Sequence, residues 1–272
     1  MMNTFVILTI WGIFYFVSIL FLNAYSGESK TISFFKFLFF LIILSLVFLP
    51  GITGHYLFHD DVYLWHWQKT DWTTHPQYIV EGLIGRPLAR IMRFSVESLV
   101  DNVSDANVVR FLTIIVMSLT ALSLDVWFRM VCGVSKKMSF LLSLSMVTLP
   151  PFQIYVHWMN SYPMAVAILL SVCSAIVLLK PRNSDKVELE FRTFSSWRTE
   201  HGHTRYFELL KNVEQKFPVG VLLSFFLLMI SLLIYQPAAP FFVALLTFWL
   251  IGLDSRSLSK VTWPLLHLII FI

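Results

Sequence analysis

The sequence predicts an all-α fold: a single polytopic membrane domain of about seven or eight transmembrane helices, covering residues 1–272. Hydrophobic residues make up 57% of the chain and charged residues only 13%, and the mean hydropathy is +0.73. A soluble domain carries roughly a quarter charged residues, so this composition excludes an ordinary soluble domain. The 26 Phe and 9 Trp residues suit lipid-facing helices with aromatic side chains near the headgroups.

The individual helices are predicted from apolar runs close to the length that a bilayer requires, about 17 to 25 residues. In chain order, these runs cover residues 4–22, 34–50, 108–131, 138–156, 162–179, 219–235 and 238–253. A last run, 261–272, would rise only about 18 Å as a helix, which is too short to cross. We therefore expect the chain to end inside a span and to be incomplete at its C-terminus.

The Lys and Arg residues between the runs predict the orientation of the chain, because cytoplasmic loops carry an excess of both. All the basic connections can be cytoplasmic if the N-terminus lies outside. They hold Lys30 and Lys36, then Arg129, Lys136 and Lys137, then the loop of about residues 180–217, and finally Arg256 and Lys260. Segment 51–107 then faces the exterior or periplasm.

Three arginines in this outer segment break the orientation rule, and an amphipathic interfacial helix over residues 87–100 would explain them. Pro87 suits the first turn of a helix, and Gly85 allows a sharp entry. Helical spacing separates a charged face from an apolar face. The charged face holds Arg86, Arg90, Arg93 and Glu97, and the apolar face holds Leu88, Ile91, Met92 and Leu99.

We therefore expect an exposed basic strip along this helix. Its arginines either snorkel toward lipid phosphates or clamp a phosphate group through bidentate guanidinium contacts. The clamp is favoured because an acidic pair lies in the same outer segment.

That acidic pair is Asp60 and Asp61, placed just after the run 34–50. Ionisable residues at a membrane boundary are costly, so they usually face water or carry function. Adjacent carboxylates point in different directions on a helix or a strand, so one would act as base or ligand while the other orients it or holds a basic partner. The alternative is a solvated pair that only marks the membrane boundary.

Aromatic and histidine residues crowd the same segment. Sugar rings stack on aromatic faces, although interfacial belts use the same residues. The residues are Tyr63, Trp65, Trp67, Trp72 and Tyr78, with His55, His59 and His66 flanking the pair. The histidine spacing matches no established metal site. We therefore expect no metal and no other cofactor, although a divalent metal could be drawn from these histidines. The net charge of +4 comes mostly from short loops and indicates no nucleic-acid partner.

Together, Asp60-Asp61, the aromatic stretch 65–72 and Gly85-Arg86-Pro87-Leu88 resemble the pattern of polytopic GT-C glycosyltransferases. The closer resemblance is to the type II Gtr glucosyltransferases that modify bacterial O-antigen. It covers roughly residues 35–180.

A later outer turn of that family is also similar to this chain. It combines a Pro-rich helix end with a Ser-Tyr segment, which here are Pro150-Pro151-Phe152 and Ser161-Tyr162-Pro163. Many members carry an acidic residue shortly after this turn, where Met164-Ala165-Val166 stands here.

The resemblance implies a GT-C-like fold in the cell inner membrane, with the outer loop of about residues 51–107 as the catalytic loop. It implies an enzyme that moves glucose or another hexose from a polyprenyl-phosphate donor to O-antigen or a related surface glycan on the periplasmic side. Its partners would be that donor, a saccharide acceptor and membrane lipid. The expected site residues are Asp60 and Asp61 as catalytic groups, Arg86, Arg90 and Arg93 for the donor phosphate, and Tyr63, Trp65 and Trp67 for sugar stacking.

Two other function classes stay open from the sequence. A transporter or flippase of lipid-linked saccharides would need polar residues within several spans, and Asp125 is the main candidate. A non-catalytic assembly subunit would leave Asp60, Asp61 and Arg86 individually replaceable.

Overall fold

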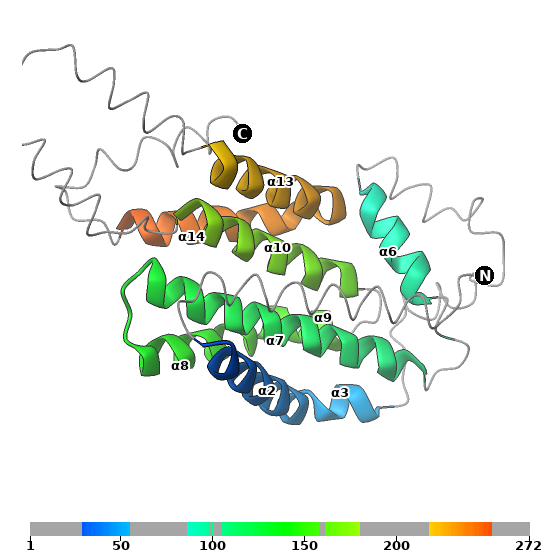
Figure 1. Ribbon diagram of the computed structural model, residues 1–272. Coiled ribbons are helices and arrows are strands. Elements are labelled where there is room, and N and C mark those ends of the chain that lie inside the picture. Colours follow the sequence, from blue (N-terminus) through cyan, green and yellow to red (C-terminus); the bar gives the residue numbers. More distant parts are fainter. Residues whose placement is uncertain are drawn as a thin grey trace, which may run out of the picture.

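The computed structural model describes residues 29–54, 86–97, 100, 105–157, 161–179 and 218–251. These residues form α-helices and one short 3-10 helix, with no strand among them. The predicted all-α class is therefore confirmed for these ranges. Figure 1 shows long helices lying side by side, with α6 placed across one end of the bundle.

Two central helices, α7 (Ala106–Met130) and α10 (Tyr162–Leu179), form the core of the bundle. They correspond to the predicted spans 108–131 and 162–179, and both are long and apolar enough to cross a membrane. Both are apolar around most of their circumference, which is typical of a helix surrounded by other helices. Accordingly, Trp127 is fully buried.

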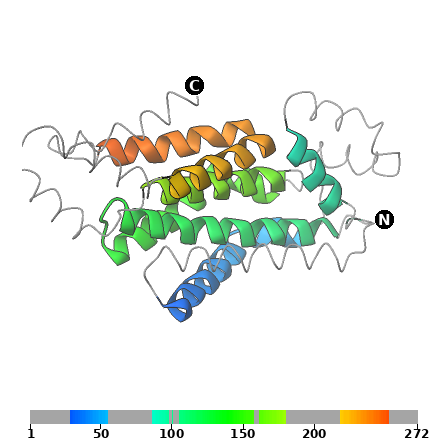
Figure 2. The ribbon, with the colours of Figure 1, turned by 45° about the horizontal axis from the view of Figure 1, so that its top comes forward.

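Outer helices cover this central pair. On one side α2 (Lys30–Val47) and α8 (Lys136–Val147) pack against α7, and on the other α13 (Pro218–Ile234) and α14 (Ala239–Ile251) pack against α10 (Figure 2). The outer helices expose large apolar side chains, including Phe35, Leu46, Leu141, Leu222 and Phe226. Soluble monomers rarely expose extensive apolar surface, so these faces suit an apolar surrounding.

The predicted span 138–156 is wrong as one continuous helix. The chain instead forms α8 and then α9 (Pro150–His157), with a break at Thr148 and Leu149. Pro150 and Pro151 have no backbone N–H to donate to the preceding turn, and their rings clash with it. The residue before a proline also avoids helical angles. Two consecutive prolines therefore start a new helix.

The predicted run 34–50 is also divided. Helix α2 begins four residues earlier, where the Ser29 side chain accepts a hydrogen bond from the Ile32 amide at 3.4 Å. It ends at Val47, and α3 (Leu49–Thr53) follows with Pro50 in its first turn. The last two predicted spans begin and end within a few residues of α13 and of η3 (Gln236–Ala238) with α14.

The runs 4–22 and 261–272 and the loop 180–217 lie outside the described residues, so the total of seven or eight spans stays a prediction. The long helices α2, α7, α8, α10, α13 and α14 alternate in direction along the chain, so their ends gather at two distinct ends of the bundle (Figure 1). We call one the lysine end, which gathers Lys36, Arg129, Lys136 and Lys137, and the other the arginine end, which gathers Arg86, Arg90, Arg93 and Arg110. Gly133 closes the α7–α8 turn at the lysine end with φ 66°, an angle that favours glycine.

A seam of buried serines joins α10 to α13. The hydroxyls of Ser171 and Ser231 lie 2.8 Å apart, and those of Ser174 and Ser224 lie 2.9 Å apart. The Ser174 hydroxyl also lies 2.8 Å from the Ser224 carbonyl oxygen, and the Ser224 hydroxyl lies 3.1 Å from the Ser174 carbonyl oxygen. Such contacts require close backbones, which small residues permit between apolar helices.

We expect Ser174→Leu to destabilise the protein far more than Ser174→Ala. The alanine loses the contacts of one buried hydroxyl, about 1 kcal/mol, whereas the leucine also forces the two helices apart, for a total of about 3 kcal/mol. Titrating the purified protein with a denaturing detergent in mixed micelles would measure both free energies of unfolding. Thr247→Leu, on the exposed face of α14, serves as a control expected to change stability by less than about 0.5 kcal/mol. Equal losses for the two Ser174 variants would contradict the close packing of the seam.

Candidate functional site

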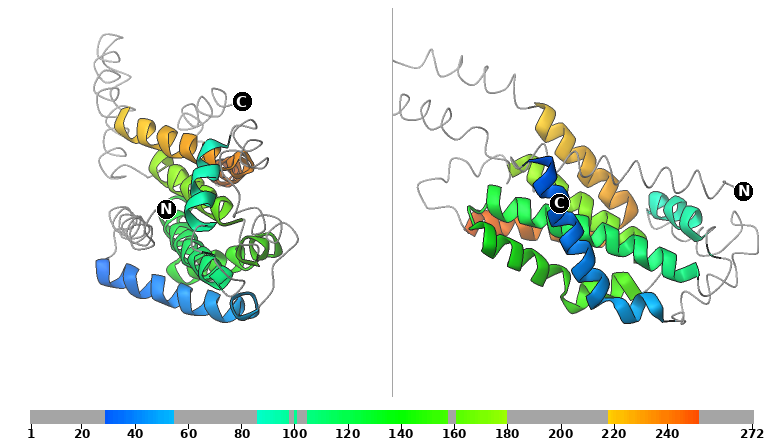
Figure 3. Two further views of the ribbon diagram at one scale, coloured as in Figure 1. Left: turned by 90° about the vertical axis from the view of Figure 1, so that its right-hand side faces the viewer. Right: turned by 60° about the horizontal axis from the view of Figure 1, so that its bottom comes forward.

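The arginine end is crossed by α6 (Pro87–Glu97), which packs against α10 and α13 (Figure 3). The predicted helix beginning at Pro87 is therefore confirmed, and it ends at Glu97 rather than at residue 100. Its axis runs across the bundle rather than along it, as a helix in the membrane interface would.

The arginines of the segment 86–97 are less exposed than expected. Ala89 is 3% exposed and Arg93 only 7%, whereas Ile91 is 60% exposed. Arg86 and Arg90 are half-buried. The expectation of an exposed basic strip is therefore wrong, because the small Ala89 allows close approach and arginine stems can pack on apolar neighbours. Leu88 and Met92 of the expected apolar face also pack against the core, so parts of both faces meet the bundle.

Arg86 is held by the turn between α13 and α14. Its Nε donates to the side-chain oxygen of Gln236 at 2.7 Å, and its guanidinium lies 4.9 Å from the centre of the Tyr235 ring. Both partners are uncharged, so they orient the guanidinium without neutralising it. The Nε–H is one of five donors, and the two terminal nitrogens can still make an end-on bidentate contact with a phosphate.

Arg110 is a further arginine at this end, with a structural role, and the sequence reasoning missed it. It is fully buried. Its Nε donates to the His157 carbonyl at 3.1 Å, and its Nη1 donates to the Gly54 carbonyl at 3.1 Å and to the Asn107 side chain at 3.0 Å. Arg110 thereby joins the ends of α3 and α9 to the start of α7. Carbonyls at helix C-termini lack helical partners and carry partial negative charge, which a guanidinium satisfies.

One sequence signal could have revealed Arg110: it lies inside the apolar run 108–131, where a charge needs a specific partner. The close approach of α3 and α9 supports the same junction. A Cβ added to Gly51 would lie 3.1 Å from the His157 ring, and the rings of Phe48 and His157 meet edge to face at 6.1 Å.

This junction and Arg86 anchor both ends of segment 55–85 at the same end of the bundle. Gly54 precedes the segment and Arg86 follows it. The predicted site residues Asp60, Asp61, Tyr63, Trp65 and Trp67 all belong to this segment and lie outside the described residues. Of the predicted site residues, the described ranges thus contain the three arginines of α6.

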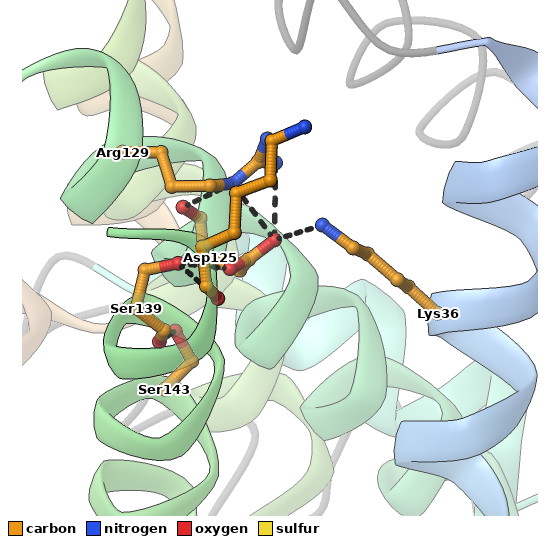
Figure 4. A network of polar contacts seen from close by, with 6 residues as sticks. Lys36, Asp125, Arg129, Ser139 and Ser143 are labelled. Carbon is orange, nitrogen blue, oxygen red and sulfur yellow. Dashed lines mark hydrogen bonds and ion pairs between the residues drawn. The ribbon is translucent and has the colours of Figure 1, made fainter. Parts of the chain in front are cut away.

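The lysine end contains Asp125, the candidate for a transport role (Figure 4). Its carboxylate is fully buried and lies 3.0 Å from the Lys36 Nζ and 3.0 Å from an Arg129 Nη. Ser139 donates its hydroxyl to the other carboxylate oxygen at 2.5 Å. These contacts join α2, α7 and α8, which gives Asp125 a structural role.

Within the described ranges, no three His, Cys, Asp or Glu side chains lie close enough together to hold a metal ion. Comparison of the chain with protein-family models, with curated proteins and with solved structures gave no match. The chemistry of the site therefore has to be argued from its own residues.

We expect Arg110→Met to lower the free energy of unfolding by about 2–4 kcal/mol, because three partly buried acceptors lose their donor at once. Arg110→Lys should recover only part of this loss, since a single nitrogen cannot reach the acceptors of three helices. Lys137→Met removes the same charge from an exposed position and should change stability by less than about 0.5 kcal/mol. Detergent-induced unfolding measures all three variants. Similar stabilities for Arg110→Met and Lys137→Met would contradict the junction.

Proposed function

We propose that this protein is a multi-pass glycosyltransferase of the cell inner membrane. It would move glucose or another hexose from a polyprenyl-phosphate donor to O-antigen or a related surface glycan on the periplasmic side. The observation that carries the proposal is the arginine end. There, Arg86 is oriented by uncharged partners. The segment that holds Asp60 and Asp61 follows Gly54, which Arg110 binds at the same end of the bundle, and is followed by Arg86.

A membrane location is supported by the composition, by the two helices of spanning length and by the apolar faces of the outer helices. We place the lysine end in the cytoplasm, because basic residues collect on that side of a membrane. The arginine end then lies at the periplasmic surface, where α6 would meet the headgroup of a lipid-linked donor. The seven or eight spans and the GT-C-like architecture belong to this proposal.

The proposed reaction uses one carboxylate and one or two guanidinium groups. Asp60 or Asp61 accepts the proton of an acceptor hydroxyl, and the hydroxyl oxygen then attacks the anomeric carbon with inversion. The bond from that carbon to the phosphate oxygen breaks, and its electron pair leaves with the polyprenyl phosphate. Arg86 stabilises the negative charge that develops on this leaving group. A guanidinium that is already held in position suits this role.

The three arginines of α6 divide between two roles in this proposal. Arg86 and Arg90 are half-buried and can meet a phosphate group, with Tyr63, Trp65 and Trp67 stacking on the sugar. Arg93 is 7% exposed, so we assign it to holding α6 against the bundle. No metal or other cofactor is required for this chemistry.

We expect the loss of the catalytic carboxylate, by Asp60→Asn or by Asp61→Asn, to abolish glycan modification. The asparagine keeps the size of the side chain but cannot accept a proton, which typically costs 10²- to 10⁴-fold in rate. Modification of the surface glycan in cells, at equal protein level, measures the effect of each. Full modification by both variants would contradict the catalytic role.

We expect Arg86→Gln to reduce transfer by about 10²-fold, the usual cost of removing one donor to a developing anion. Arg86→Lys should lie between this variant and the wild type, because it keeps the charge without the bidentate geometry. Isolated membranes with labelled polyprenyl-phosphate glucose measure transfer directly. Lys211→Gln, which removes one positive charge from the loop 180–217, should leave transfer unchanged. If Arg86→Gln behaves like this control, a transporter or an assembly subunit becomes the better interpretation.

A further inference from the structure

A second region with ligand-binding character lies at the lysine end, away from the proposed catalytic site. Two shallow hollows adjoin there, between α2 and α8. The first, of about 370 Å³, is lined by Ile32, Phe35, Lys36, Phe39 and Phe140. The second, of about 430 Å³, is lined by Lys36, Lys136, Lys137, Phe140 and Leu141. Because they share Lys36 and Phe140, they form one surface, which we call the lysine groove.

The walls of the lysine groove are apolar and open to the surroundings. Phe35 is 64% exposed and Leu141 57%, whereas Phe140 is fixed in place by stacking on Phe40 at a ring distance of 4.8 Å. Aromatic and aliphatic walls of this kind suit hydrocarbon chains.

The polar part of the lysine groove is positively charged. Among the described residues of this end, Asp125 is the one acidic residue, and it faces Lys36 and Arg129. Lys136 and Lys137 add two further charges in the first turn of α8, where both are exposed. The Ser135 side chain does not cap this helix. Its N-terminal amides and positive dipole end therefore add to the attraction for an anion.

We propose that the lysine groove binds an anionic phospholipid. Lys136, Lys137 and the first turn of α8 hold the headgroup phosphate, with Lys36 beneath them. The acyl chains lie along Phe35, Phe39 and Leu141. This assignment depends on the membrane location proposed above but not on glycosyl transfer. A free phosphate would use the lysines and leave the apolar walls uncovered, so the two sources can be separated by experiment.

The test measures lipid retention on the purified full chain by native mass spectrometry, with phosphatidylglycerol and phosphatidylcholine offered at equal concentration. We expect the wild type to prefer phosphatidylglycerol by about tenfold, because lysines near an anionic headgroup attract it. The double variant Lys136→Gln with Lys137→Gln should lose this preference. Lys136→Arg with Lys137→Arg should keep it, because the charge is retained.

A matched control removes two charges from another basic stretch, by Lys211→Gln with Lys216→Gln. It should keep the preference. Equal retention of the two lipids by the wild type overturns the proposal, and so does an equal loss in the control variant. Competition by inorganic phosphate as effective as that by phosphatidylglycerol would also overturn it, in favour of a simple anion site. No sugar donor is present, so these outcomes are independent of the transferase activity.

Discussion

Burial of polar groups inside an apolar helical bundle is the constraint on which the rest of this structure depends. A buried polar group without a partner costs more than a hydrogen bond contributes, which favours partners for buried polar groups within the protein. The chain meets this requirement in three places: Asp125 with Lys36 and Arg129, the serine seam between α10 and α13, and Arg110 at the meeting point of α3, α7 and α9. Apolar packing alone would hold the same helices with much less definite register, because it has no direction.

Helix α7 connects two of these places, since it carries Arg110 in its second turn and Asp125 near its last. Fifteen residues separate them, a rise of about 22 Å along the helix. Each charge faces the helices that begin or end at its own level: α2 and α8 around Asp125, and α3 and α9 around Arg110. The two ends of the bundle thus become chemically different, one rich in lysine around a carboxylate and the other rich in arginine around carbonyl and amide oxygens. That difference underlies both proposed binding regions.

The sequence predicts some of these features well and others poorly. The helices α7 and α10 and the start of α6 at Pro87 depend on local patterns, apolar length and proline preference, and they are confirmed as helices. The break before α9 was also encoded locally, in Pro150 and Pro151, but the long apolar run concealed it. The prediction of an exposed basic strip on α6 was wrong for a different reason: amphipathicity separates two faces but does not say how much of each face the bundle buries. The partners of Arg110 and Arg86 are distant in the sequence, at His157 and Gln236, and no local pattern reports them.

Two arginines at the arginine end have different roles: Arg110 stabilises the fold, whereas Arg86 is proposed to bind a phosphate. Arg110 directs its donors to backbone carbonyls, which belong to the fold and cannot exchange for a substrate. Arg86 is placed by a side-chain amide and an aromatic face, contacts that fix its position and leave its charge uncompensated by either partner. A guanidinium that these contacts already hold in one rotamer loses little conformational entropy when it binds an anion. Inward-facing arginines on α6 therefore fit a phosphate that enters between helix and bundle better than one that lies on an exposed surface.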